Sequence, residues 1–198
     1  MNWTRTILDG IVLCIIFNAV VGLFFFIIPQ AYSVMFPKGL KKAAAPYVKK
    51  KDLDTMHRVL YPMYLLMFVY MAVSANSAGV TGFWNLFWTG YIEIMFVNIS
   101  DFVLLDCLAR IYVKDKNMIK GCEGHPDWEW KGWRKLAAPE HFLAWPLIFY
   151  PLFFFYWGFM TVLVINTEEK WLEEVCGEEY REYKRKVNRC IPWKKVIE

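Results

Sequence analysis

The chain has 198 residues, of which 57% are hydrophobic and 19% aromatic, and it carries a formal net charge of +4. This apolar content is higher than that of an ordinary soluble domain of the same length, so the composition excludes that class and indicates an integral membrane protein. No nucleic-acid-binding module is visible, and we attribute the modest positive charge to loops that face a membrane.

The apolar residues form blocks separated by charged segments, which predicts an all-α integral membrane bundle with about four hydrophobic segments and a C-terminal amphipathic helix. Because hydrocarbon forces the backbone to satisfy its own hydrogen bonds within helices, no strand is expected. Internal repeats and low-complexity linkers are absent, so a single membrane domain is expected over residues 1–198. The predicted hydrophobic segments are residues 7–29, 59–80, 83–113 and 139–165.

The first segment, residues 7–29, is long enough to cross a hydrocarbon core of ~30 Å at ~1.5 Å per residue. A signal peptide is the alternative interpretation. We favour a retained helix, because the apolar run exceeds the usual core of ~7–15 residues and no small-x-small cleavage site follows it.

The second segment becomes less apolar over residues 74–79, a Ser- and Gly-containing stretch without Lys or Arg that predicts a tight turn and a helical hairpin with the third segment. The third segment carries four polar side chains that are costly in lipid, so they are expected to face the bundle interior, a cavity or the interface. They can line a pocket for a polar substrate or cofactor, or they can be structural. These residues are Glu93, Asn98, Asp101 and Asp106, the last expected near Arg110 at the interface.

Residues 114–136 are expected to form a loop at the membrane interface, because they contain three tryptophans among charged residues. A substrate lid is the alternative. The fourth segment, residues 139–165, contains Pro146 and Pro151, which are expected to kink a membrane helix without breaking it. His141 near its start can accept a proton or make a structural hydrogen bond.

The charged segment from Asn166 to Trp193 begins where the last apolar block ends. It contains Glu168-Glu169, Leu172, Gly177, Glu179-Tyr180, Tyr183, a basic run, Arg189 and Ile191-Pro192. In this pattern it resembles the C-terminal signature of the isoprenylcysteine carboxyl methyltransferase and phospholipid methyltransferase superfamily. Cys176 stands where that superfamily usually has Phe.

The resemblance implies that Glu168 and Glu169, with Tyr180 from the same signature, help to hold S-adenosylmethionine, whose sulfonium and ammonium groups are cationic. The alternative is that both acids only stabilise a helix start near Asn166, where carboxylates are favoured by the helix dipole and by a capping box.

Upstream, the chain departs from the superfamily, whose active members carry Arg-His-Pro-x-Tyr before the Glu-Glu pair. His125-Pro126 lies 43 residues before Glu168, at a suitable distance, but Gly124 and Trp128 replace the Arg and the Tyr. A second similar run, residues 57–64, opens the second apolar block. The candidate catalytic residues are His125, His141 and Asp101.

The five cysteines include no Cys-x-x-Cys pair, so we expect reduced thiols and no metal site. The resemblance implies methyl transfer from S-adenosylmethionine to a lipid-like or lipidated acceptor at the membrane surface, with membrane lipids as partners and no nucleic acid. A non-catalytic scaffold or lipid-binding relative is the alternative, and a nicotinamide enzyme resembling sterol reductases is the third.

The sidedness signals disagree. With Arg110 counted with the loop that follows it, the two loops between segments hold 14 Lys and Arg residues and the two ends hold 9. Four simple crossings therefore place the tail outside by the positive-inside tendency, whereas the resemblance implies a cytosolic tail in what we expect to be a bacterial cytoplasmic membrane. A fourth segment that re-enters at Pro146 and Pro151 would resolve the conflict.

Overall fold

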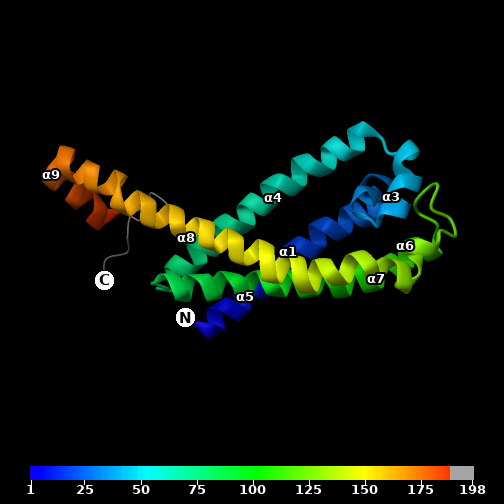
Figure 1. Ribbon diagram of the computed structural model, residues 1–198, viewed down its shortest axis with the longest axis horizontal. Helices are drawn as coiled ribbons and strands as arrows, with labels where there is room; N and C mark the ends of the chain where they lie inside the picture. Colours follow the sequence, from blue (N-terminus) through cyan, green and yellow to red (C-terminus); the bar gives the residue numbers. More distant parts are fainter. Residues whose placement is uncertain (188–198) are drawn as a thin grey trace. The chain divides into compact units, whose positions relative to one another are not determined.

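The computed structural model describes residues 1–187, except for the side chains of residues 157–162 and 165. Within these residues the chain is helical and contains no β-strand, which confirms the all-α prediction (Figure 1). Its contacts divide it into two compact units, residues 1–150 and the chain from Pro151 onward. Each unit is described by itself.

The first long helix, α1 (Trp3–Ile27), starts at Asn2, whose side-chain oxygen accepts a hydrogen bond from the Arg5 amide at 3.1 Å. Its end precedes Pro29, the first residue of α2 (Pro29–Tyr32). Short helical turns then reverse the chain: η1 (Ser33–Met35), α3 (Lys38–Ala44) and η2 (Ala45–Tyr47).

The second long helix, α4 (Lys50–Ser77), begins well before the apolar block that predicted it. In the described part of the chain, α1 and α4 are the helices that are individually long and apolar enough to cross a membrane. This agrees with the first two predicted hydrophobic segments, and the other two stay predictions as membrane spans.

The third segment is a continuous run of α5 (Phe83–Asp101), the π-helical η3 (Phe102–Ala109) and α6 (Arg110–Asp115). A turn that contains Gly79 and Gly82, both with positive φ, joins it to α4. Helix α5 packs against α1. A Cβ atom added at Gly10 of α1 would lie 2.8 Å from Cδ2 of Phe96, so a larger residue there would require the Phe96 side chain or the helices to shift.

The predicted fourth segment, residues 139–165, corresponds to the π-helical η5 (Glu140–Phe149) and α8 (Tyr150–Asn166). Before it come the short η4 (Pro126–Trp128) and α7 (Trp130–Pro139). The prediction of a loop up to residue 136 is wrong from Trp130 onward, because that stretch is the start of α7. The physical reason is a one-sided apolar face: Trp133 and Ala137, one turn apart, are both buried.

In the second unit, α9 (Glu168–Lys186) follows a break at Thr167, one residue later than the helix start predicted at Asn166. Gly177 has φ 55° and ψ −126°, and there the helix folds back on itself (Figure 1). Lys184 of the second half reaches Glu173 of the first at 2.7 Å. Arg189 and Ile191-Pro192 of the tail signature lie outside the described residues.

Candidate functional site

The first unit contains a cavity of about 390 Å³ between α1, α4, α5 and η5. Most of its wall is apolar, and its polar groups gather where the end of α5 faces the start of η5. Four polar residues at that end are Asn98, Asp101, Glu140 and His141. An apolar chamber of this size with a few convergent polar groups is the usual form of a small-molecule site.

The imidazole of His141 is held through both ring nitrogens. Nδ1 lies 2.9 Å from Oδ1 of Asn98, and Nε2 lies 2.8 Å from Oδ2 of Asp106. The Asn98 amide nitrogen also donates to the His141 carbonyl at 2.8 Å, so the amide oxygen is turned toward the ring. Both ring nitrogens then face acceptors, so a protonated His141 can donate from both.

Asp106 is itself fixed by the segment that follows. Its Oδ1 accepts from Nε1 of Trp133 at 3.0 Å, and its backbone carbonyl accepts from Nε of Arg110 at 3.0 Å. The Arg110 guanidinium also lies over the rings of Trp130 and Trp133, 5.6 and 5.7 Å from their centroids. The expected proximity of Asp106 and Arg110 is therefore confirmed, and Asp106 holds the His141 ring in place.

Asp101, unlike Asp106, is one of the residues that line the cavity. Its Oδ2 is 3.9 Å from Nε2 of His141, too far for a hydrogen bond but close enough for electrostatic attraction. Three tyrosines of the cavity wall also interact electrostatically with this carboxylate. They are Tyr32, Tyr64 and Tyr150.

Both helices that build this end have π-helical winding. The winding begins directly after Asp101 in η3 and at Glu140, directly before His141, in η5. Wider turns of this kind change the direction of neighbouring side chains and are frequent at functional sites. No sequence pattern predicted them.

The structure brings together two of the three predicted catalytic residues, His141 and Asp101. The third, His125, lies in the loop that caps η4, where its Nδ1 accepts from the Asp127 amide at 3.1 Å. His125 does not belong to the cavity lining. Glu140, Tyr32, Tyr64 and Tyr150 were not predicted, because only the fold places them beside Asp101.

In the tail, the predicted cofactor residues have different environments. Glu168 is exposed, whereas Glu169 is buried with its carboxylate 3.1 Å from Nζ of Lys184. Tyr180 stacks on Tyr183, and Lys184 lies over its ring at 5.7 Å. Hydrogen bonds from Lys184 hold the pKa of the Glu173 carboxyl below its usual range, and the same contacts to Glu173 and Glu169 raise the pKa of Lys184.

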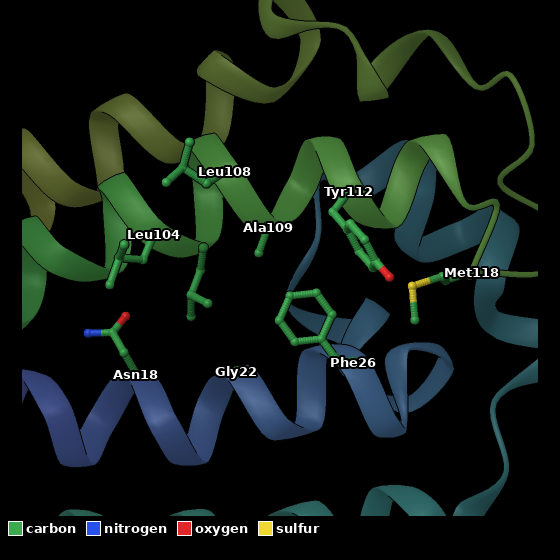
Figure 2. Close-up of a pocket in the computed structure, with 9 residues that line it drawn as sticks. Asn18, Gly22, Phe26, Leu104, Leu108, Ala109, Tyr112 and Met118 are labelled. Carbon is green, nitrogen blue, oxygen red and sulfur yellow. The ribbon is translucent and has the colours of Figure 1, made fainter.

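A second hollow, an open groove of about 690 Å³, runs between α1 and the η3–α6 run (Figure 2). Figure 2 shows Phe26 and Tyr112 directed into it from opposite helices, above the floor at Gly22. Its lining is apolar apart from Asn18 and the Tyr112 hydroxyl and contains no charged residue. The groove therefore lacks the charged groups that could bind or react with a polar ligand. We take the cavity beside His141 as the candidate site.

No protein-family model, curated protein or solved structure matches this chain. The candidate site therefore has to be interpreted from its own geometry. The resemblance of the tail to the methyltransferase superfamily stays a prediction.

Proposed function

We propose that the protein is a membrane-embedded binding protein for a lipid-like molecule that carries a cationic amine, held in the cavity beside His141. One observation carries the proposal: the polar end of an otherwise apolar cavity is acidic. Asp101 and Glu140 line it, Asp106 lies against His141, and the lining residues that the structure describes include no Lys or Arg.

Charge favours a cationic ligand. When they are ionised, Asp101, Asp106 and Glu140 carry three negative charges. A protonated His141 ring, which donates from both nitrogens, carries one positive charge. Carboxylates removed from water are costly without a partner, and at low effective dielectric their attraction for a cation is strong. An ammonium group beside Asp101 would supply the missing positive charge.

The aromatic residues of the cavity support the same ligand class. Tyr32, Tyr64, Trp145 and Tyr150 all line it. The face of an aromatic ring attracts cations, and aromatic walls are a common way to bind alkylammonium groups. Farther from the acids, Leu60 and Met67 belong to the apolar wall, which suits an alkyl chain.

A membrane position fits the outer surface of the first unit. Large apolar side chains are exposed on α1, α4 and η5, for example Ile15, Leu65 and Leu147, whose exposed fractions are 64–65%. Such surface suits lipid better than water. We propose that the four predicted hydrophobic segments all lie in a bacterial cytoplasmic membrane, with the tail in the cytosol.

The test is thermal unfolding of the detergent-purified chain with dodecylamine, dodecanol or dodecanoate, which share one chain length. Dodecylamine is expected to raise the unfolding midpoint, with about 2.7 kcal/mol of stabilisation at a hundred times its Kd. Asp101→Asn is expected to reduce this stabilisation, whereas Glu123→Gln, at an exposed residue outside the cavity, leaves it unchanged. Equal stabilisation by dodecanol, or no loss in Asp101→Asn, would contradict the proposal.

Methyl transfer from S-adenosylmethionine to such an amine is the second candidate. Two observations favour it: the tail signature, and an imidazole beside the cavity that can take part in proton transfer. The predicted cofactor residues do not fit the cationic cofactor in this arrangement, because Lys184 already neutralises Glu169 and Glu168 is exposed.

Calorimetric titration of the full chain with S-adenosylhomocysteine separates the two candidates. Binding that weakens in a folded Glu168→Gln, Glu169→Gln double variant would support methyl transfer. Lack of binding to folded, lipid-reconstituted protein would reject methyl transfer and leave the amine-binding proposal unaffected.

A further inference from the structure

A second polar cluster lies in the first unit, apart from the cavity lining. It joins three helices: α1 supplies Asp9, α4 supplies Tyr70 and Ser74, and α5 supplies Glu93. Asp9 lies near the start of α1 and Ser74 near the end of α4, whereas Glu93 lies in the middle of α5. Neither proposed function uses this cluster.

Asp9 is buried and fully partnered. Its carboxylate accepts from Nε of Arg5 at 3.1 Å and from the Tyr70 hydroxyl at 2.7 Å, and it also accepts a short hydrogen bond from the Ser74 hydroxyl. Arg5 donates to Ser74 as well, at 2.7 Å. The charge of Asp9 is therefore matched by Arg5, the positive group of this cluster.

Glu93 differs from Asp9 in that it is buried without a partner. Its side chain is 1% exposed, and within the described residues neither carboxyl oxygen has a hydrogen-bond partner. The hydroxyl of Thr89, one turn earlier on the same face of α5, is also buried and unpartnered. The groups that interact electrostatically with Glu93 are Asp9, Arg5 and Tyr70.

An ionised Glu93 would be an unpaired anion near a second carboxylate, and Arg5, the cation that interacts with it among the described residues, is already bound to Asp9. Burying an unpaired charge costs far more than burying a neutral group, and a like charge nearby adds to that cost. A metal ion is a poor counter-charge, since the described residues contain no group of three or more His, Cys, Asp or Glu able to hold one. A proton needs no such ligand set.

We propose that Glu93 is a proton-binding site inside the helical bundle, occupied at neutral pH and coupled to the charge of Asp9. The Asp9 network provides the contact with water, because the side chain of Arg5 is 47% exposed while that of Asp9 is 3% exposed. Intramembrane carboxyl groups that hold protons are typical components of proton relays.

Infrared spectroscopy of the full chain tests this proposal through the carbonyl band of a protonated carboxylic acid. At neutral pH the native protein is expected to show a band that shifts in D₂O and is lost in Glu93→Gln, while Glu123→Gln retains it. In Asp9→Asn the band is expected to disappear at lower pH than in the native chain, because the neighbouring negative charge is gone. A native spectrum without such a band, or a pH dependence unchanged in Asp9→Asn, would overturn the proposal.

If either variant fails to fold, chemical labelling of the native chain replaces that comparison. Dicyclohexylcarbodiimide adds to a protonated carboxyl: the acid proton moves to a carbodiimide nitrogen while the carboxyl oxygen bonds to the central carbon, so the adduct contains both molecules entire. Mass spectrometry is expected to place the adduct on Glu93 and not on the exposed Glu123. Its yield should fall about tenfold per pH unit once Glu93 ionises. No adduct on Glu93 at neutral pH would overturn the proposal.

Discussion

His141 and Asp106, which are 35 positions apart in the chain and belong to two different π-helical segments, are joined by a contact of 2.8 Å between Nε2 and Oδ2. The contact fixes the ring at the cavity, because Asn98 holds the other nitrogen. Trp133 holds the second oxygen of Asp106, so a residue of α7 also contributes to the position of the ring. The polar end of the cavity is thus a preorganised unit.

Asp106→Asn is expected to lower the free energy of unfolding by about 1–3 kcal/mol, because the amide oxygen can still accept from Trp133 but the charged acceptor of His141 is lost. The measurement is reversible unfolding in mixed detergent micelles. Asp115→Asn, at an exposed residue of α6, is the matched control and is expected to be neutral. Equal stability of the two variants would show that the 2.8 Å contact contributes little.

Gly177→Ala is expected to open the folded-back tail. The glycine has φ 55° and ψ −126°, a conformation that a side chain makes unfavourable by about 1–3 kcal/mol. The contact between Lys184 and Glu173 depends on this reversal.

The measurement for Gly177→Ala is hydrogen exchange of the tail amides. They are expected to exchange faster in that variant and at the native rate in Cys176→Ala, which alters the adjacent exposed residue. Unchanged protection in Gly177→Ala would show that the fold-back does not require this backbone conformation.

The helical class was predictable because the sequence consists of long apolar blocks separated by charged segments, a pattern that predicts helices. The boundaries were less so. Residues 130–136 read as a loop because charged side chains alternate there with tryptophans, and only the packing of Trp133 against Phe36, with ring centroids 5.1 Å apart, shows why the segment is helical. The π-helical winding of η3 and η5 depends on tertiary packing and has no local signal.

Half of the candidate site was also predictable. Asp101 and His141 were predicted as site residues because a polar side chain within an apolar block is energetically costly, which indicates a functional or structural role. The tyrosines that line the cavity with Asp101 could not be predicted, since nothing in the sequence around Tyr32 and Tyr64 distinguishes them from other tyrosines of the chain. Their convergence depends on how α2 and α4 pack, which a single sequence does not reveal.

The tail is expected to lose its fold-back on acidification. Lys184 lowers the pKa of Glu173 in the folded tail. The pair therefore stabilises the folded tail fully above about pH 4.3, the pKa of glutamate in an unfolded chain, and this stabilisation is lost as the pH falls through the lower pKa of Glu173 in the folded tail. Lys184 has a raised pKa in the folded tail. Its contribution to the stability of the folded tail is therefore complete below about pH 10.4 and is lost as the pH rises through this raised pKa.

Hydrogen exchange of the tail amides, corrected for the intrinsic pH dependence, measures this effect. The protection of the tail amides from exchange is expected to be greatest between about pH 4.3 and about pH 10.4. In Lys184→Met this protection is expected to lose its pH dependence. An acid transition that persists unchanged in Lys184→Met would assign the pH dependence to other groups.

Cys122 is expected to resist alkylation at neutral pH while Cys176 reacts. Burial raises the pKa of the Cys122 thiol to about 11, and the thiol also donates to the Leu40 carbonyl at 3.3 Å. Because the thiolate is the nucleophile, a high pKa and lack of access both slow the reaction. Cys176 is exposed on α9.

Peptide mapping after treatment with iodoacetamide distinguishes these two positions. In the native chain Cys176 is expected to be labelled and Cys122 to remain free, and denaturant should make both reactive. Leu40→Ala, which opens the packing around the Cys122 sulfur while keeping the carbonyl acceptor, is expected to speed labelling of Cys122 alone. Rapid labelling of Cys122 in the native chain would mean that the loop after α6 does not pack on α3 as described.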